Sequence, residues 1–216
     1  MSEVAVCFLT YRRTEYALPC LESLVRNLAC TGGWHLHIAD NGSSVEHVNA
    51  LVDMARSFGV EPSVSIAQGG GYGHNYNVAT QMLHSTYDVI MPLEDDWRLL
   101  TLTNIDQYIA AAKERNACIR VGSLGIVGRL FGELVHYGGH FYLEFDPNSP
   151  DQYVFSGNPR IETRDWERAV GPWPEGLRAG ETEITVAARK AARTRVLWPL
   201  GIESFGLFAH IGAVKA

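Results

Sequence analysis

The sequence of 216 residues lacks a long hydrophobic stretch, since its apolar runs are all shorter than ten residues. A helix that crosses a bilayer needs about 20 consecutive apolar residues, so no membrane span is expected. The first residues, MSEVAVCFLTYRR, place an acid before an apolar run and two arginines after it. This order is the reverse of that in a secretory signal peptide. The sequence therefore predicts a cytoplasmic protein.

Cysteine and basic residues are also scarce. The four cysteines, Cys7, Cys20, Cys30 and Cys118, form no Cys-x-x-Cys pair and have no histidine at zinc-like spacing. They are interpreted as small apolar side chains in a reducing compartment. The net charge of −6 disfavours general nucleic-acid binding, because neutralising phosphates requires a basic surface.

Several nucleotide-binding and catalytic motifs are missing. The glycine run at 69–73 does not fit the dinucleotide fingerprint, because His74 and Tyr76 stand where the third glycine is required. The chain contains no Gly-Lys-Ser/Thr sequence of a P-loop and no Gly-x-Ser-x-Gly nucleophile elbow. A nucleotidyltransferase is disfavoured because Thr10-Tyr11-Arg12-Arg13, after the first predicted strand, contains no glycine.

Strand-like and helix-like patterns alternate four times in the first half of the chain. Strands are expected at 4–10, 34–39, 62–67 and 89–93, and helices at 15–28, 45–58, 74–83 and 104–114. Short connections between them predict a mostly parallel sheet with helices on both faces, an α/β fold. In the second half we expect strands at 120–127, 133–145 (bent at 138–139) and 196–199, and a helix at 181–192. No linker is evident, so residues 1–216 are predicted to form a single domain.

The strand predicted at 89–93 runs directly into three acids, Glu94-Asp95-Asp96. Three neighbouring carboxylates repel one another, and a divalent cation bound by their oxygens would offset that repulsion. Ligands of open α/β sheets bind at the carboxyl ends of strands, where these acids lie. The alternative is a solvated acidic loop.

These features together resemble the nucleotide-sugar glycosyltransferases of the GT-A fold, and specifically their inverting family 2 group. Four segments at successive strand ends carry the resemblance: Thr10-Tyr11-Arg12, Asp40-Asn41-Gly42-Ser43-Ser44, Gly69-Gly70-Gly71-Tyr72-Gly73 with Asn75 and Asn77, and Glu94-Asp95-Asp96. It covers about residues 4–100 well and the remainder loosely. It implies a Rossmann-like GT-A fold with a nucleotide-sugar half at about 1–100 and an acceptor half, with a smaller sheet and loops, at about 101–216.

The resemblance also implies roles for individual residues. Residues expected to bind the nucleotide sugar are Thr10, Tyr11, Arg12, Asp40, Asn41, Gly70, Gly71, Asn75, Glu94 and Asp95. Glu94-Asp95-Asp96 matches the family's Asp-x-Asp, with glutamate as a departure in first position, and implies that Asp96 binds Mn²⁺ or Mg²⁺ with Glu94 and His210. For Asp40 the alternative is an ordinary Asx turn, and for His210 a packed histidine.

An inverting transfer needs a general base, which the family places at the start of a late helix. The matching segment is Gly180-Glu181-Thr182-Glu183, and by register Glu181 is the preferred base, with Glu183 open as the second choice. The acids that usually precede this position in the family are absent, and the alternative is that both glutamates only complement the helix dipole.

The resulting prediction is a metal-dependent inverting glycosyltransferase that moves a sugar from a nucleoside diphosphate to an acceptor hydroxyl. The acceptor is left open among a glycan, a lipid-linked sugar, a small molecule and a modified base, and the oligomeric state is not predicted. The competing hypothesis is a non-catalytic nucleotide- or glycan-binding protein of the same fold.

Overall fold

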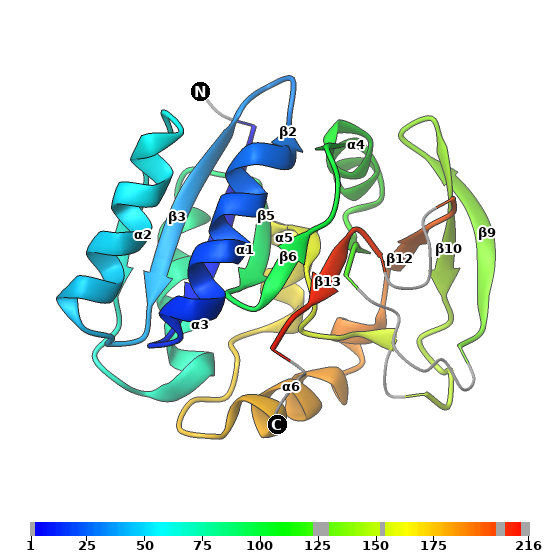
Figure 1. Cartoon of the computed structure of the whole chain (residues 1–216). Helices are drawn as coiled ribbons and strands as arrows, with labels where there is room; N and C mark the ends of the chain where they lie inside the picture. The colour runs from blue at the N-terminus through cyan, green and yellow to red at the C-terminus, as the bar shows by residue number, and fades with distance from the viewer. Residues whose placement is uncertain (1–2, 123–129, 152–153, 202–205, 213–216) are drawn as a thin grey trace.

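The computed structural model describes residues 3–122, 130–151, 154–201 and 206–212 (Figure 1). Its centre is a nine-stranded sheet in the order β4-β3-β1-β5-β11-β8-β12-β10-β9. The sheet draws its first four strands from the first half of the chain and the other five from the second half. Both halves of the sequence therefore contribute to one continuous sheet.

The first half forms the parallel part of the sheet. Its strands are β1 (Val4–Thr10), β3 (Trp34–Asp40), β4 (Ser63–Ile66) and β5 (Val89–Glu94). β1 pairs with β3 on one side and β5 on the other, and β4 adds to β3, all in parallel. All seven residues of β1 are buried, which explains its continuous apolar sequence.

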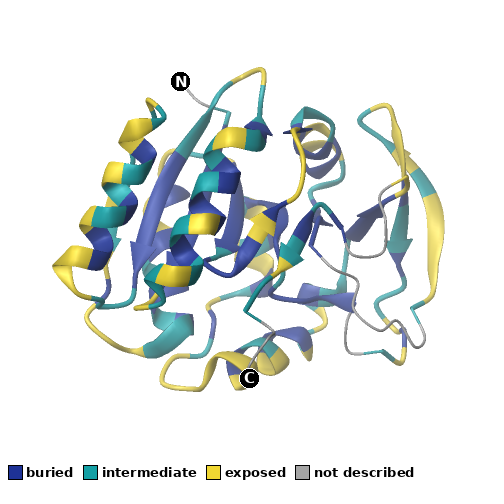
Figure 2. Ribbon diagram, viewed as in Figure 1, coloured by how far each residue is buried: buried dark blue, intermediate teal, exposed yellow. Residues whose placement is uncertain are grey.

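Helices cover both faces of this sheet, as the burial pattern in Figure 2 shows. One face packs against α1 (Thr14–Asn27), α2 (Val45–Ser57) and α4 (Asp106–Arg115). The other packs against α3 (Gly71–Leu83), α5 (Arg164–Val170) and α6 (Ala179–Ala187). Successive side chains of β1 alternate between the two cores: Val6 and Phe8 join the first, Cys7 and Leu9 the second. The predicted α/β architecture is confirmed.

The second half forms the antiparallel and mixed part of the sheet. Its strands are β11 (Arg160–Thr163), β8 (Cys118–Arg120), β12 (Val196–Pro199), β10 (His140–Phe145) and β9 (Gly132–Tyr137). β9 and β10 form an antiparallel hairpin that turns at Gly138 and Gly139, where the sequence predicted a bend. Two short pairs lie outside the main sheet: β2 (Leu28–Ala29) with β7 (Thr103–Asn104), and β6 (Trp97–Leu99) with β13 (Phe208–His210). The second pair brings the end of the described chain to the acidic strand end.

Two predicted elements need correction. The helix expected at 181–192 is wrong over its second half, because α6 ends at Ala187 and a separate 3₁₀ turn, η2, follows at Ala191–Arg193. The Arg189 guanidinium binds the carbonyls of Val170, Gly171 and Pro172, which ties the segment after α6 to the end of α5. The strand expected at 120–127 is observed as β8 at 118–120, and residues 123–129 lie outside the described part.

No helix among the described residues is both long enough and apolar enough to cross a membrane, in agreement with the short apolar runs of the sequence.

His37 is a fully buried histidine in the middle of β3. Its Nδ1 lies 2.8 Å from Ser63 Oγ and its Nε2 lies 2.9 Å from Ser65 Oγ, both on the edge strand β4. Burial, followed by repulsion from nearby His35, lowers the pKa of His37 to about 4. The neutral imidazole is therefore part of the folded structure.

Folding should consequently weaken as the pH falls through the range from about 6.5 to about 4. In the unfolded chain His37 binds a proton at the ordinary histidine pKa, whereas in the folded protein it does so only near pH 4. At low pH this difference lowers the free energy of unfolding by at most about 3 kcal/mol. Urea unfolding at pH 7 and pH 5 measures the loss, and His37→Gln should lose less stability between the two pH values. His140→Gln, at an exposed histidine, is the control. Equal pH dependence of all three proteins would contradict the assignment.

Candidate functional site

The carboxyl ends of β1, β3 and β5 meet at one edge of the sheet. Thr10 is paired in register with Asp40, and Leu9 with Glu94. Parallel strands that end together present their following side chains to a common space, which is where open α/β sheets bind ligands. The structure thus brings together three of the predicted strand-end motifs.

Asp95 is fixed by the end of β1. Its Oδ2 accepts hydrogen bonds from the Thr10 hydroxyl at 2.9 Å and from the Tyr11 N–H at 3.1 Å. The Thr10 hydroxyl also lies 2.8 Å from Nε2 of buried His47, whose Nδ1 lies 2.7 Å from the Thr14 hydroxyl. Because the single Thr10 proton goes to Asp95, His47 Nε2 is the donor to Thr10. His47 was not predicted, since a histidine on a helix 37 residues away carries no local signal.

Arg13 neutralises part of the acidic cluster. Its guanidinium donates to Asp96 Oδ2 at 2.7 Å and also forms an ion pair with Asp95. The sequence motif had instead singled out Arg12. The Arg12 side chain is exposed, and its guanidinium carbon lies 4.6 Å from the centroid of the Tyr11 ring. The backbone of Arg12 has a positive φ of 62°. The carboxylate repulsion for which a cation was expected is therefore partly offset by the chain itself.

Asp96 also contacts the last described strand. His210 Nε2 lies 3.3 Å from Asp96 Oδ2, and the His210 ring stacks on Trp97 with 4.7 Å between centroids. The Ile211 N–H donates to the Asp96 carbonyl at 2.9 Å, and a side chain on Gly212 would collide with the Asp96 carboxylate. Asp96 Oδ1 is buried and has no hydrogen-bond partner among the described residues.

These observations test whether a divalent cation fits. Asp96 and His210 converge, and the unpaired Asp96 Oδ1 offers a further ligand atom. The two aspartates, Asp95 and Asp96, share one guanidinium, so about one negative charge remains for a cation to balance. The ligand atoms of Glu94, Asp96 and His210 do not all lie within 4.8 Å of one another. Among the described residues, the only set of three potential metal ligands that meets this distance lies elsewhere in the molecule. Carboxylate oxygens suit both Mn²⁺ and Mg²⁺.

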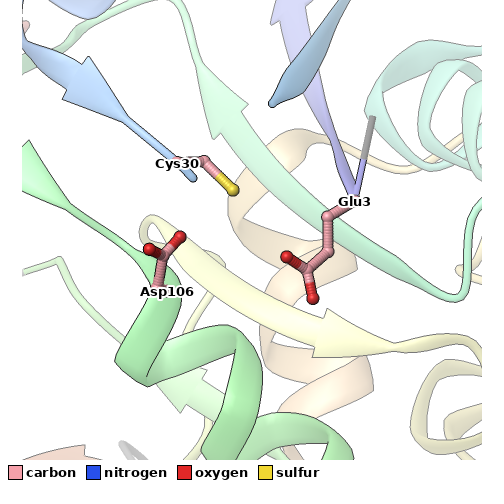
Figure 3. A group of neighbouring side chains, drawn as sticks. All are labelled: Glu3, Cys30 and Asp106. Carbon is pink, nitrogen blue, oxygen red and sulfur yellow. The ribbon is translucent and has the colours of Figure 1, made fainter. Parts of the chain in front are cut away.

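That remote group is Glu3, Cys30 and Asp106, near β2 and α4 (Figure 3). Its carboxylates already have partners, because Lys113 Nζ lies 2.7 Å from Glu3 and the Thr31 N–H donates to Asp106 at 2.9 Å. Hydrogen bonds from Thr31 lower the pKa of Asp106 to about 2. The group is best explained as a tie between chain segments.

Asp40 serves both as a turn residue and as an open acceptor. Its Oδ2 accepts from the N–H groups of Gly42 at 2.9 Å and Ser43 at 2.7 Å, which is an Asx-type turn. Within the described part of the chain, its Oδ1 is buried and has no hydrogen-bond partner, and the same holds for the side-chain oxygens of Asn41 and Asn75. Three buried acceptors without donors at one strand end are costly unless a ligand supplies N–H or O–H groups.

The glycine turn packs against the second half of the chain. Any side chain on Gly73 would collide with the Pro174 carbonyl, and one on Gly71 would lie 3.2 Å from the Leu177 carbonyl. The Gly70 carbonyl accepts from the Gly176 N–H at 3.0 Å. The glycines therefore allow α3 to approach the 174–177 turn, a use that the sequence motif did not indicate. The roles predicted for Gly70 and Gly71 in nucleotide binding remain predictions.

The two candidate bases differ in their surroundings. Glu181 is exposed, and its carboxylate accepts from the Arg178 N–H at 3.2 Å as part of the α6 cap. Glu183 accepts from the Gly157 N–H at 2.6 Å and from the Ser156 hydroxyl at 3.1 Å. Burial, followed by the charges of Asp96 and Glu183, raises the pKa of Glu94 to about 8. Glu183 is therefore held by the Ser156–Gly157 turn and its charge acts on Glu94, whereas Glu181 caps a helix.

Comparisons with known proteins identify the fold. No protein-family model and no curated protein matches this sequence. The structure is similar to TarS of S. aureus in complex with UDP-GlcNAc, with a TM-score of 0.70, 18% identity, and coverage of 99% of this chain and 62% of that one. It is also similar to the mannosyltransferase PcManGT of Pyrobaculum calidifontis in complex with GDP-Man and Mn²⁺, with a TM-score of 0.58, 13% identity, and coverage of 93% and 57%.

A third similar structure is a UDP-glucose pyrophosphorylase in complex with UDP-glucose, with a TM-score of 0.56, 13% identity, and coverage of 99% and 95%. The fold of this chain is the GT-A fold of nucleotide-sugar glycosyltransferases, as the sequence predicted. The chain spans about three fifths of the TarS chain in complex with UDP-GlcNAc.

Removing the Arg13 charge should increase the response of the protein to a divalent cation. In Arg13→Met, Asp95 and Asp96 lose their counter-charge, and the free energy of unfolding should fall by roughly 1–3 kcal/mol. Mn²⁺ should then raise the melting temperature of the variant more than that of the wild type. Thermal unfolding with MnCl₂ and with EDTA measures both effects.

The control is Arg26→Met, which breaks an exposed pair with Glu22 on α1 and should change neither value appreciably. A melting temperature unaffected by Mn²⁺ in all three proteins would show that the acidic cluster binds no such cation.

Proposed function

We propose that this protein is a metal-dependent inverting glycosyltransferase that uses a nucleoside-diphosphate sugar. The observation that carries the proposal is the meeting, at one sheet edge, of unpaired acceptors at Asp40, the Asp96–His210 pair, and Glu183 beside Glu94. The first two would bind a nucleotide and a cation, and Glu183 would act as the base. The GT-A fold supports this combination.

The donor is proposed to bind across the ends of β1 and β3. The buried unpaired oxygens of Asp40, Asn41 and Asn75 match the N–H groups of a nucleobase and the hydroxyls of ribose. The described structures of TarS and the mannosyltransferase hold UDP-GlcNAc and GDP-Man, which supports a nucleotide sugar as donor here.

Asp96 and His210 are proposed to hold Mn²⁺ or Mg²⁺. When bound, such a cation neutralises charge that develops on the departing diphosphate. Arg13 keeps Asp95 and Asp96 in place through its two ion pairs. Thr10 and Tyr11 orient Asp95 from the opposite side.

Glu183 is proposed as the general base, in place of the initially preferred Glu181. The acceptor oxygen bonds to the anomeric carbon as the bond from that carbon to the diphosphate breaks, and Glu183 takes the hydroxyl proton. Attack from the face opposite the leaving group inverts the anomeric centre. Two hydrogen bonds hold Glu183 Oε1, and Oε2 accepts none from the described residues, so Oε2 is available for the proton.

The acceptor is proposed to carry a hydroxyl, in a glycan, a lipid-linked sugar, a small molecule or a modified base. The net charge of −6 disfavours general nucleic-acid binding. The cytoplasmic location expected from the sequence remains a prediction.

The assignment of the base can be tested with the two glutamates. Glu183→Gln should lower turnover by roughly 100-fold or more, because Gln cannot take a proton. Glu181→Gln, the matched variant two residues away, should stay within about 3-fold of the wild type. Slow hydrolysis of UDP-GlcNAc or GDP-mannose, with water as acceptor, supplies the rate. If Glu181→Gln loses turnover while Glu183→Gln keeps it, the assignment is reversed.

The metal site can be tested by nucleotide binding. Isothermal titration of the wild type with UDP-GlcNAc and GDP-mannose should show binding that requires Mn²⁺ or Mg²⁺ and is lost with EDTA. Asp96→Asn should weaken the metal-dependent part by roughly 10-fold or more. Asp106→Asn, in the remote group, is the control and should bind normally. Binding without any donor hydrolysis would favour the non-catalytic alternative, and the absence of binding would refute the proposed function.

A further inference from the structure

A charged pair lies inside the protein behind the candidate site. Arg160 and Glu162, both on β11, have no solvent-exposed side-chain surface. Arg160 Nε donates to Glu162 Oε2 at 2.6 Å, and the Tyr76 hydroxyl donates to Glu162 Oε1. Burying two charges costs several kcal/mol, so such a pair is weak evidence for a purely stabilising role.

Aromatic rings fix the orientation of the Arg160 guanidinium. Its central carbon lies 5.3 Å from the ring centroids of Tyr76 and Phe155, and 5.2 Å from that of Trp173. Rings at these distances attract the cation and leave it little room to turn. The guanidinium is thus a fixed donor on β11.

Arg160 connects this interior pair to the candidate base. Its Nη1 donates to the Gly157 carbonyl at 3.1 Å. The N–H of the same residue, Gly157, donates to Glu183 Oε1 at 2.6 Å, and the neighbouring Ser156 hydroxyl donates to the same oxygen at 3.1 Å. Within the same turn, the Asn158 N–H donates to Ser156 Oγ at 3.3 Å. The contacts run without a break from Glu162 to Glu183.

The turn fits closely around Glu183. A Cβ on Gly157 would lie 3.2 Å from Glu183 Oε1, so only glycine brings its N–H this near without displacing the carboxylate. Two hydrogen bonds from this turn to the same carboxylate oxygen therefore fix the position of Glu183.

We propose that Arg160, held by Glu162 and Tyr76, is a positioning residue that fixes the Ser156–Gly157 turn and thereby aims Glu183 at the acceptor. Its catalytic meaning rests on the proposed role of Glu183 as base. The contact between the turn and Glu183 can be tested without any activity.

The first experiment uses the amide resonance of Gly157. Arg160→Lys keeps a positive charge for Glu162, but one ammonium cannot reproduce the planar fork that reaches both Glu162 and the Gly157 carbonyl. The Gly157 amide proton, shifted downfield by its short bond to Glu183, should move upfield in Arg160→Lys. Glu183→Gln provides the reference for a weakened bond. Arg164→Lys, at an arginine that also binds a backbone carbonyl, should leave the resonance unchanged.

The second experiment measures donor hydrolysis and donor affinity. Arg160→Lys should lower kcat by roughly 10- to 100-fold, because a slightly misplaced base is much less effective. Its KM for the donor should stay within about 2-fold. Arg160 on β11 is separated from Asp40 on β3, where the donor is proposed to bind, by the two strands β1 and β5. Arg164→Lys should keep wild-type kcat and KM.

The outcomes separate the inference from the proposed function. An unchanged Gly157 resonance in Arg160→Lys overturns the inference, whether or not the protein is active, and so does a wild-type kcat in an active protein. Absence of donor binding and hydrolysis in the wild type refutes the proposed function, while the Gly157 resonance still decides the contact. If Arg160→Lys does not fold, Arg160→Met/Glu162→Met removes both buried charges and should show the same upfield shift and lower kcat.

Discussion

Repulsion between carboxylates at the end of β5 is the constraint on which the site depends. Glu94, Asp95 and Asp96 follow one another, and Glu183 faces them from α6. Such a cluster persists only when opposite charge and hydrogen-bond donors surround it. Arg13 supplies one charge, the end of β1 supplies donors to the Asp95 carboxylate, and His210 at the end of β13 lies beside the Asp96 carboxylate. The remaining negative charge is the reason for proposing a divalent cation at this edge.

The sheet supplies these partners because it joins distant parts of the chain. β1 lies between β3 and β5, so the polar ends of three strands meet at one edge. β11 adds to β5 in the opposite direction and leads away from the turn that holds Glu183. The acidic end of β5 and the turn that holds Glu183 are thereby joined to adjacent strands of one sheet. Such mounting gives the precise geometry that group transfer requires.

Much of the fold was predictable from local patterns. Fully apolar runs followed by amphipathic segments marked β1, β3, β5 and the helices between them, because these periodicities follow from the repeat of each element. The second half was less predictable. The helix expected to 192 stops at Ala187, where Arg189 ties the following segment to carbonyls at the end of α5. That contact is non-local, and no local signal indicated it.

The sequence by itself determined the alternation of strands and helices in the first half and the placement of Thr10, Asp40 and the acids at strand ends, since these are local features. Where two residues of the same type lie close together in the sequence, only the tertiary structure decided which of them makes the contact. Arg13 rather than Arg12 meets the aspartates, and Glu183 rather than Glu181 meets the Gly157 turn. Adjacent residues share nearly the same sequence signal. Their directions depend on how helices and turns dock, which is set by contacts between distant segments.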